Sequence, residues 1–356
     1  MVKILISSGG TGGHVIPAQV LYDYLVDKND IIITSDNRGL NYLDKKIYNT
    51  KKIDVPKISN KILGFIPFVF FFTLSIVKSY FFLRQKKIKI LISTGGYMSI
   101  PICIAARILK LKILLFEPNL VLGRSNLFLL NYSDKIFTYS KNIRNFPKKM
   151  IYKNFVIKPL IRKNIFFSKT KLKKKKSKFS ILIIGGSQGA KKFDDLFKKD
   201  FIRLSENFKI EIYHQTSNEN LKNLKNFYLK NNINFQVFSY TKNLYKIIKK
   251  CDFVITRSGA STINELVFLE KPFLAIPFPF AKDDHQFYNA DYYVKKNLGW
   301  LIREDEIKQN FLYKFIMNLI KNKSLLIQKK KNMHKFHNAN NWKQNSDIVK
   351  NLIKKK

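Results

Sequence analysis

The stretch VKILISSGGTGGH at residues 2–14 joins a short apolar run to a loop that contains four glycines. The run at 3–7 is typical of a buried parallel strand, and an apolar helical pattern resumes at 17–25. Glycine lets backbone N–H groups approach a ligand without a Cβ in the way, and the start of a helix favours an anion. This stretch therefore predicts a parallel α/β sheet with an anion-binding loop at the carboxyl ends of its strands.

The same alternation of short apolar runs and longer amphipathic runs continues along the chain. We expect further strands at 30–34, 89–93, 112–116, 135–139, 179–184, 210–214, 235–238, 253–256 and 273–277. A lysine-rich run at 171–178 separates the two series. The sequence thus predicts two doubly wound, Rossmann-like α/β domains facing each other across a cleft, with bounds 1–163 and 164–333. A polar, basic helix at about 334–356 could pack back on the first domain.

Composition limits the classes of function. The chain has 356 residues and 46% hydrophobic residues, enough for two packed cores, which excludes a disordered protein. Lys and Arg number 66 against 24 Asp and Glu, and the net charge is +42. Only nine of these cations are arginines, whereas surfaces that read nucleic acids favour arginine. We therefore expect an anionic membrane surface as a partner and no nucleic acid.

Cellular location follows from three features. Cys103 and Cys251 show no metal-ligand spacing and are expected to be free thiols in a reducing compartment. No cleavable signal pattern precedes the first strand, so we expect a cytoplasmic protein. The apolar segment 62–83 is nearly long enough to cross a bilayer, but Pro67 and Lys78 interrupt it, and a span here would divide one sheet. We expect a helix that lies in the membrane interface instead.

His14 stands at the start of the first predicted helix. The positive end of a helix disfavours an imidazolium, so the ring could accept a proton as a general base. The alternative is a neutral ring that only hydrogen-bonds to the backbone or to a ligand. The loop before it has neither the Gly-Lys-Ser/Thr of a Walker loop nor the GxGxxG spacing of a dinucleotide site.

The second predicted domain has two more strand–loop–helix turns. The first is GGSQGA at 185–190, in which Ser187 offers a hydroxyl and an N–H group to a phosphate oxygen. The second is RSGASTINE at 257–265, whose amide groups suit a diphosphate and whose Glu265 could accept ribose hydroxyls. Glu265 could equally be an acid that only complements the helix dipole.

A third element, DDHQ at 283–286, presents Gln286 to sugar hydroxyls. Asp283 and Asp284 raise the question of a metal ion. Glycine turns and helix starts already supply groups for a diphosphate, so we expect no metal and no cofactor.

These motifs in this order resemble the MurG family of peptidoglycan glycosyltransferases: GGTGGH, GGYMSIP at 95–101, GGSQGA, RSGASTINEL and DDHQFYNA. The resemblance extends from residue 3 to about 300. It implies the two-domain GT-B fold and an inverting hexosyltransferase that moves N-acetylglucosamine (GlcNAc) from UDP-GlcNAc. The implied acceptor is the C4 hydroxyl of the N-acetylmuramyl-peptide of undecaprenyl-diphosphate-linked lipid I, and the product is lipid II. The family works at the cytoplasmic face of the inner membrane as a peripheral enzyme.

The resemblance also implies site residues. His14 is the candidate base, with Glu117 as a less favoured alternative. The implied UDP-GlcNAc contacts are Thr11, Gly12, Gly13, Asn119, Arg162, Ser187, Thr241, Arg257, Ala260, Ser261, Thr262, Ile263, Asn264, Glu265 and Gln286. Three elements depart from the family pattern: FEPN at 116–119 replaces HEQN, 157–162 replaces GNPVR, and 240–244 replaces FIxDM.

Two other functions compete with this interpretation. An epimerase of the same fold, acting on UDP-GlcNAc, would need additional acids in the cleft, and the sequence shows no clear pair. A nucleic-acid-binding protein would need arginine and aromatic clusters on one element, whereas lysine is spread over the whole chain.

Overall fold

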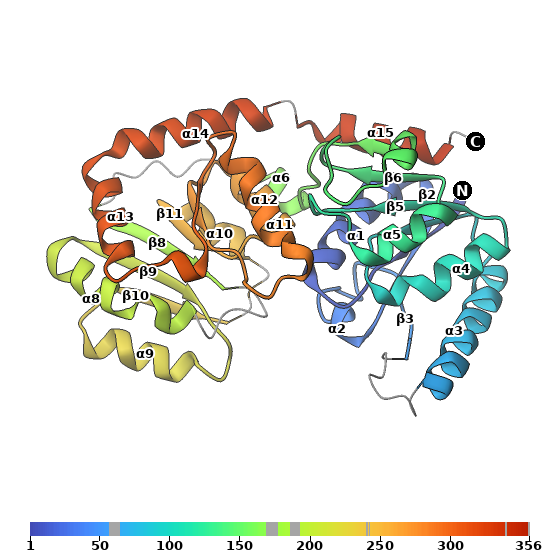
Figure 1. Ribbon diagram of the computed structural model, residues 1–356, viewed down its shortest axis with the longest axis horizontal. Helices are drawn as coiled ribbons and strands as arrows, with labels where there is room; N and C mark the ends of the chain where they lie inside the picture. Colours follow the sequence, from blue (N-terminus) through green and yellow to red (C-terminus); the bar gives the residue numbers. More distant parts are fainter. Residues whose placement is uncertain are drawn as a thin grey trace. The chain divides into compact units, whose positions relative to one another are not determined.

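The computed structural model describes residues 1–56, 65–168, 177–185, 193–239, 241, 243–338 and 340–354. The chain forms two compact units, Met1–Phe166 with Asn340–Lys356, and Phe167–Ala339. Each unit is a parallel β-sheet with helices packed on it (Figure 1). The segment that returns to the first unit begins at Asn340, later than the residue 334 expected from composition, and the first unit ends close to the expected residue 163.

The first unit contains a seven-stranded sheet in the order β3-β2-β1-β4-β5-β6-β7. Its strands are β1 (Val2–Ser7), β2 (Asn29–Ser35), β3 (Thr50–Lys52), β4 (Ile90–Ser93), β5 (Lys112–Phe116), β6 (Lys135–Thr138) and β7 (Asn154–Val156). All neighbouring strands are parallel. The strand order reverses at β1, which pairs with β2 on one side and with β4 on the other. In such sheets ligands bind where the order reverses, beyond the carboxyl ends of the strands.

Helices complete the first unit: α1 (Gly12–Leu25), α2 (Asn37–Leu40), α3 (Phe65–Gln85), α4 (Ile100–Ile108), α5 (Arg124–Leu129), α6 (Lys163–Phe166) and α15 (Trp342–Lys354). The last of these packs on α1. Its Ser346 hydroxyl donates a hydrogen bond to the carbonyl oxygen of Tyr24, and the ring of Trp342 meets the Tyr24 ring edge to face. Lys112 donates to two carbonyl groups near the end of α15. The carboxyl terminus is therefore part of the first unit.

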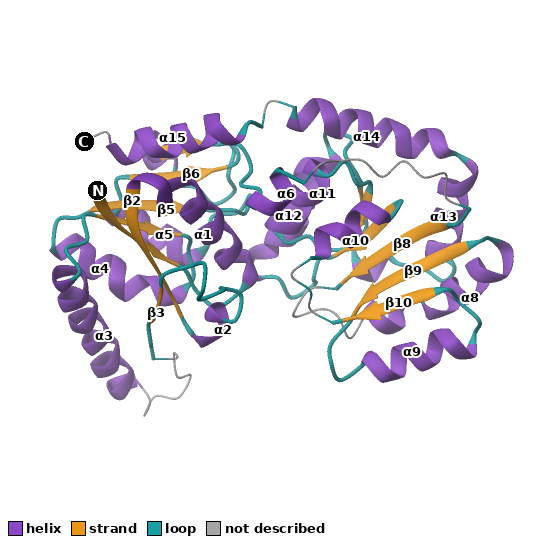
Figure 2. Cartoon of the chain, turned by 180° about the vertical axis from the view of Figure 1, so that it is seen from behind, coloured by secondary structure: helices purple, strands orange, loops and turns teal. Residues whose placement is uncertain are grey.

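The second unit contains a six-stranded parallel sheet in the order β10-β9-β8-β11-β12-β13 (Figure 2). Its strands are β8 (Phe179–Ile184), β9 (Ile210–Gln215), β10 (Phe235–Phe238), β11 (Phe253–Thr256), β12 (Phe273–Ala275) and β13 (Trp300–Leu301). Its helices include α8 (Lys198–Asn207), α9 (Leu221–Lys230), α10 (Leu244–Lys250), α11 (Ala260–Phe268), α12 (His285–Val294), α13 (Phe311–Lys321) and α14 (Lys323–His337). Here the order reverses at β8, which pairs with β9 on one side and with β11 on the other, so ligands are expected beyond the carboxyl ends of these strands.

Helix α3 has two different faces. Ser75, Ser79 and Leu83 recur every fourth residue and are buried, and α3 packs along α4 (Figure 1). The opposite face exposes Phe70, Val77 and Phe81, and Val69 and Phe71 are also exposed. Among the described residues, only Pro67–Gln85 is long and apolar enough to cross a membrane, with a mean hydropathy of 1.3 and 17% of the segment buried. The start of the apolar segment at 62–64 lies outside the described residues.

Candidate functional site

The imidazole of His14 is fixed at the carboxyl end of the first sheet. Its Nδ1 lies 2.8 Å from the backbone carbonyl oxygen of Thr94, which directly follows β4. A carbonyl oxygen can only accept a hydrogen bond, so Nδ1 carries the proton. The other nitrogen, Nε2, therefore has a free lone pair. His14 as a residue is partly exposed.

Two glycines that follow β4 pack against this ring. Gly95 and Gly96 have φ angles of +89° and +91°, which side chains of L-residues rarely adopt. A Cβ on Gly95 would lie 3.2 Å from Cε1 of His14, and a Cβ on Gly96 would lie 3.2 Å from the Cα of Gly9. The glycine loop after β4 thus packs against the backbone of the glycine loop after β1 and against the imidazole of His14. A side chain at Gly95 or Gly96 would displace the imidazole.

Asp36 holds the first glycine loop from the end of β2. Its Oδ1 accepts hydrogen bonds from the N–H groups of Gly10 (3.2 Å) and Gly39 (2.8 Å). Arg38 contacts the other carboxylate oxygen at 3.3 Å. Our sequence interpretation missed Asp36, although an acid directly after a strand was a usable signal.

Thr11, Gly12 and Gly13 lie at the amino terminus of α1, where the structure places no side-chain cap. The first N–H groups of a helix have no acceptor within that helix. Thr11 and Gly12 are partly exposed and Gly13 is exposed. The N–H of Thr11 donates to the carbonyl oxygen of Gly9, so the backbone donors near His14 are those of Gly12 and Gly13.

Glu117, the alternative base, organises its own loop. The carboxylate is 1% exposed and accepts four hydrogen bonds: from the backbone N–H and side-chain amide of Asn119, from the N–H of Gly123, and from the amide of Asn126. A carboxylate engaged in this way does not face a substrate. The geometry argues against Glu117 as the base and makes Asn119 part of the same loop.

Arg162 lies elsewhere in the first unit. Its charge acts on Tyr48, whose ring packs on Tyr22 in the second half of α1. His14 stands at the opposite end of that helix. The structure thus gives Arg162 a neighbourhood different from the glycine loops.

In the second unit, the turn after β11 leaves the start of α11 open. Gly259 precedes the helix without a side-chain cap, and a Cβ at this position would meet no atom of the described residues within 4 Å. Ala260, Ser261 and Thr262 form the first turn of the helix, where N–H groups lack helical acceptors. This open helix start is suited to an anion such as a diphosphate.

The implied UDP-GlcNAc contacts that lie after the first turn of α11 have different surroundings. Ile263 is fully buried in the core, and the side chain of Asn264 accepts a hydrogen bond from Tyr293. Both residues therefore support the helix through packing. Glu265 is 4% exposed and has interactions within the protein.

Gln286 connects two loops of this site. Its Oε1 accepts hydrogen bonds from the N–H groups of Ser258 (3.2 Å) and Phe278 (3.0 Å). Among the described residues, no partner is bound to its Nε2, so this amide group is available to a sugar hydroxyl. Thr241 precedes α10, and its hydroxyl accepts from the N–H of Asn243. Ser187 and the rest of the loop at 186–192 lie outside the described residues.

Arg257 is not placed to meet a diphosphate. The guanidinium is 5% exposed, forms an ion pair with Glu304 at 2.5 Å, and donates to the carbonyl groups of Ile276 and Pro277. Burial lowers its pKa, and Glu304 opposes that shift. The structure thus does not support the predicted contact of Arg257 with the donor, because its charge is neutralised inside the protein.

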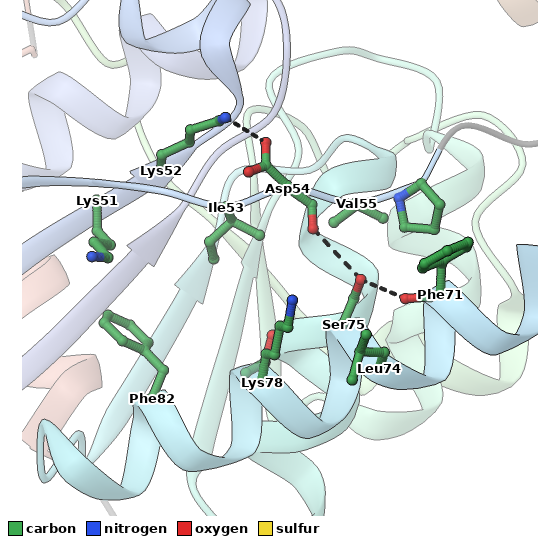
Figure 3. A pocket seen from close by; sticks show the side chains of 12 residues that line it. Lys51, Lys52, Ile53, Asp54, Val55, Phe71, Leu74, Ser75, Lys78 and Phe82 are labelled. Atoms are coloured by element: carbon green, nitrogen blue, oxygen red, sulfur yellow. Dashed lines mark hydrogen bonds and ion pairs between the residues drawn. The ribbon is translucent and has the colours of Figure 1, made fainter.

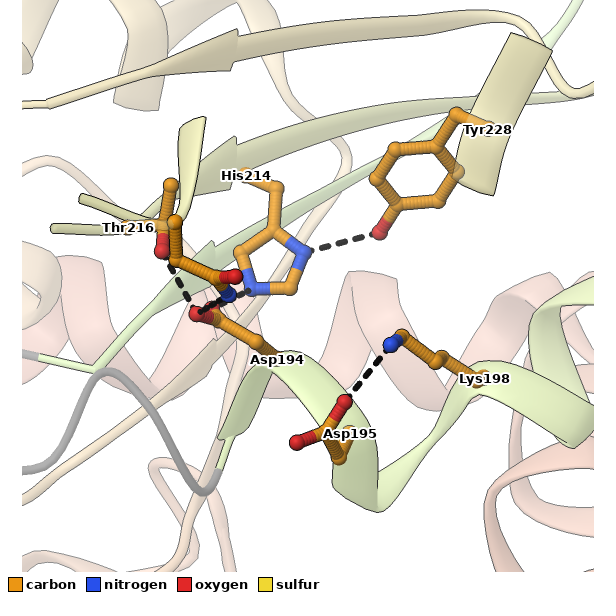
Figure 4. Close-up of polar contacts among 7 residues, drawn as sticks. Asp194, Asp195, Lys198, His214, Thr216 and Tyr228 are labelled. Carbon is orange, nitrogen blue, oxygen red and sulfur yellow. Dashed lines mark hydrogen bonds and ion pairs between the residues drawn. The ribbon is translucent and has the colours of Figure 1, made fainter. Parts of the chain in front are cut away.

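A second buried polar network joins His214 of β9 to Asp194 (Figure 4). The Nε2 of His214 is 3.2 Å from Oδ1 of Asp194, and the hydroxyl of Tyr228 contacts Nδ1 at 2.7 Å. The hydroxyl of Thr216 and the amide of Asn220 donate to the other oxygen of Asp194. Burial acts against ionisation, but these hydrogen bonds together lower the pKa of Asp194. Burial lowers the pKa of His214 from 6.5, so the ring is neutral.

Comparison with known proteins identifies the family. Residues 4–138 match the glycosyltransferase family 28 N-terminal domain, and residues 180–349 match the family 28 C-terminal domain. The chain belongs to glycosyltransferase family 28. It is a hexosyltransferase, and the two parallel α/β units are those of the GT-B fold.

Curated relatives narrow the family further. The UDP-N-acetylglucosamine–N-acetylmuramyl-(pentapeptide) pyrophosphoryl-undecaprenol N-acetylglucosamine transferase of Pelagibacter ubique (strain HTCC1062) is 49% identical over 341 residues, covering 96% of this chain and 95% of the relative. The transferase of the same name from Rickettsia bellii (strain RML369-C) is 32% identical and covers 99% of both chains. The MurG family predicted from the motifs is thereby confirmed.

Solved structures agree on the fold. The crystal structure of Acinetobacter baumannii MurG aligns with a TM-score of 0.77 at 21% identity, covering 99% of this chain and 100% of that one. The UDP co-structure of S. aureus MnaA aligns with a TM-score of 0.68 at 16% identity, covering 99% and 96%. At these identities the likeness concerns the fold alone.

Proposed function

We propose that this enzyme transfers GlcNAc from UDP-GlcNAc to the C4 hydroxyl of the N-acetylmuramyl-peptide of lipid I, which yields lipid II for peptidoglycan synthesis. The names of the full-length relatives specify this donor and this acceptor. The structural observation that carries the mechanism is the hydrogen bond between Nδ1 of His14 and the carbonyl oxygen of Thr94. It fixes the tautomer in which Nε2 accepts a proton.

The chemistry is an inverting displacement. The acceptor hydroxyl attacks the anomeric carbon of GlcNAc from the face opposite UDP, and Nε2 of His14 takes the hydroxyl proton. The bond between the anomeric carbon and the diphosphate oxygen breaks, UDP leaves with the electron pair, and a β1→4 bond forms. General-base assistance of this kind typically accelerates a reaction about 10²–10⁴-fold.

The second unit supplies the groups for the donor. The open start of α11 offers N–H groups to the diphosphate as its negative charge grows, and such preorganised donors are a large catalytic contribution. The free Nε2 of Gln286 is available to a GlcNAc hydroxyl, while its Oε1 keeps the loops at Ser258 and Phe278 in place. Loss of Gln286 would therefore weaken sugar recognition and also loosen the site.

Helix α3 fits attachment to the membrane surface where a polyprenyl-linked acceptor resides. Its exposed face carries Phe70 and Phe81, which are 65% and 62% exposed. Beside it, Lys51, Lys78 and Phe82 line a pocket of about 490 Å³ between residues 51–56 and α3 (Figure 3). Apolar side chains flanked by lysines suit acyl chains below and anionic headgroups above.

Helix α3 is also held firmly by the first unit. It connects β3 to β4, which belong to one sheet, and its Ser75, Ser79 and Leu83 are buried against the protein. A helix held in this way lies along the membrane surface. We place the enzyme at the cytoplasmic face of the inner membrane as a peripheral protein.

A transfer assay tests the reaction directly. Radiolabelled UDP-GlcNAc and a short-chain lipid I analogue are incubated with the full chain, with and without a chelator, and the products are separated by chromatography. The expected result is label in a lipid II product, at the same rate with chelator. A labelled UDP-sugar epimer formed without acceptor, and no labelled lipid, would contradict the proposal in favour of an epimerase.

Vesicle flotation tests the membrane surface separately. The variant Phe70→Ser/Phe81→Ser is expected to bind vesicles of anionic phospholipid less than the native chain, and binding by the native chain is expected to weaken with added salt. Leu229→Ser is a matched control, because it removes an exposed apolar side chain of the second unit. Equal loss in both variants, or binding insensitive to salt, would contradict the assignment of α3.

A further inference from the structure

Two histidines and one glutamate converge on the surface of the second unit. His334 and His337 lie on the last turn of α14, three residues apart and hence on one face of the helix. Glu270 follows α11 in a left-handed conformation with φ of +52°. Its Oε1 lies 2.7 Å from Nδ1 of His334 and 3.1 Å from Nε2 of His337. One ligand atom from each residue lies within 4.8 Å of the other two.

As ligands, the three side chains favour transition-metal ions. In the metal-free protein both ring nitrogens that contact the carboxylate must donate a proton to it, because the carboxylate only accepts. A divalent ion can replace those two protons and bind all three atoms. Two imidazoles and one carboxylate suit Zn²⁺, Ni²⁺ or Cu²⁺, whereas Mg²⁺ and Ca²⁺ prefer oxygen ligands alone.

The surrounding structure holds the ligands in place. The ring of His337 is 18% exposed and packs near the ring of Phe268, with the centroids 5.2 Å apart. The two helices that carry the cluster, α11 and α14, pack against each other. His334 is 60% exposed, so water can complete the coordination of an ion.

Positive charge around the cluster opposes the binding of a cation. Lys330, Lys331 and Lys335 are on the same helix as the histidines, and their repulsion weakens cation binding. Lys271, next to Glu270, does not compete for the carboxylate, because its Nζ donates to the carbonyl groups of Lys249 and Cys251.

We propose that Glu270, His334 and His337 form a binding site for a divalent transition metal, with Zn²⁺ as the best match. The site is separate from the residues proposed for sugar transfer, so its role is structural. His337 is the last residue of α14, and the chain leaves the second unit directly after Ala339. A bound ion would fasten this end of α14 to α11.

Isothermal titration of the full, untagged chain with ZnCl₂ tests the proposal. The expected result is one Zn²⁺ bound per chain, weaker binding at lower pH because the ligands must lose protons, and no competition from Mg²⁺. Glu270→Gln and His334→Ala are each expected to weaken binding at least tenfold. His285→Ala is the matched control, because that histidine hydrogen-bonds to the carbonyl oxygen of Lys282 outside the cluster.

Cobalt absorption spectra provide an independent measurement. Co²⁺ at this site is expected to give visible bands without a thiolate charge-transfer band, since Cys103 and Cys251 are buried. The bands are expected to disappear in His337→Ala, whose folding is checked by circular dichroism. Absence of Zn²⁺ binding, or Zn²⁺ binding and Co²⁺ bands that persist in all three cluster variants, would overturn the proposal. Sugar transfer by the cluster variants is expected to equal that of the native chain, which separates this test from the test of the proposed function.

Discussion

The two units hold their ligand loops by different chemistry. In the first unit, carboxylates accept hydrogen bonds from backbone N–H groups: the partly buried Asp36 from Gly10, and the buried Glu117 from Gly123. In the second unit, buried side chains pair with one another, as Arg257 does with Glu304 and His214 with Asp194. The first arrangement leaves one imidazole nitrogen free to exchange a proton. In the second arrangement the charged side chains are buried in pairs, and backbone N–H groups face the ligand. These groups can bind an anion but do not accept a proton.

Removal of the free imidazole should have the largest effect on activity. His14→Ala is expected to lower turnover about 10²–10⁴-fold, because the acceptor hydroxyl loses its base. The affinity for UDP-GlcNAc, measured by calorimetry, is expected to stay nearly constant, since the donor groups belong to the second unit. Unchanged turnover in this variant would show that the first unit does not supply the base. The proposed difference between the two units would then be wrong.

Disruption of the buried pair in the second unit should chiefly affect stability. Arg257→Met removes the guanidinium that pairs with the buried Glu304 carboxylate, and we expect a loss of about 3–5 kcal/mol in the free energy of unfolding. The measurement is urea denaturation followed by circular dichroism. The double variant Arg257→Met/Glu304→Leu should recover most of this loss. If the single and double variants were equally unstable, packing of the guanidinium on Phe193 would be the main contribution.

Glycine substitutions compare backbone strain in the two units. Gly95→Ala places a Cβ at φ of +89° against His14, and we expect a cost of about 1–3 kcal/mol in unfolding free energy. Gly259→Ala in the second unit meets no atom of the described residues within 4 Å and should leave that free energy nearly unchanged. Gly95→Ala should also lower turnover because the ring moves. Equal stability of both variants would show that the first unit's loop relaxes.

The smallest expected effect is a pH dependence from His214. Its pKa is lowered from 6.5 in the folded protein by burial, so the unfolded chain binds a proton more readily. Below about pH 6.5 the free energy of unfolding should therefore fall, by at most about 1.4 kcal/mol per pH unit. Asp194 faces the ring and favours its charged form, whereas Lys198 disfavours it. Denaturation at pH 7.5 and 5.5 measures the slope.

His214→Gln is the test of this assignment. The variant is expected to lose the part of the slope that lies between these pH values. The lowered pKa of Asp194 has its effect at lower pH, below the ordinary value of 3.8, so it does not contribute there. A slope identical in the native chain and the variant would assign the pH dependence to other groups.

Sequence patterns predicted the strands of both sheets that have four or more residues. They missed β3, β7 and β13, because strands of two or three residues at or near an edge have too few positions to show a period. His14 was predicted from its place after a glycine loop. Its partner Thr94 could not be, since only the pairing of β1 with β4 brings the two residues together.

Two charged residues show the limit of motif reasoning. Glu117 and Arg257 lie beside recognisable motifs, and an acid or a cation there was interpreted as a ligand-binding group. The partner of Arg257 is Glu304, which comes from a distant segment, whereas Glu117 is held by residues of its own loop, among them Gly123 and Asn126. Which way each charge faces depends on how the chain folds around it, and the motif alone does not contain that information.

The return of the chain to the first unit has a consequence for biosynthesis. The second unit is one continuous segment, whereas the first needs α15 to cover Tyr24 and the face of α1. A ribosome therefore delivers every residue of the second unit before the last helix of the first has emerged. The unit that carries His14 is completed last, so a chain that stops early would release a finished nucleotide-sugar domain joined to an unfinished catalytic one.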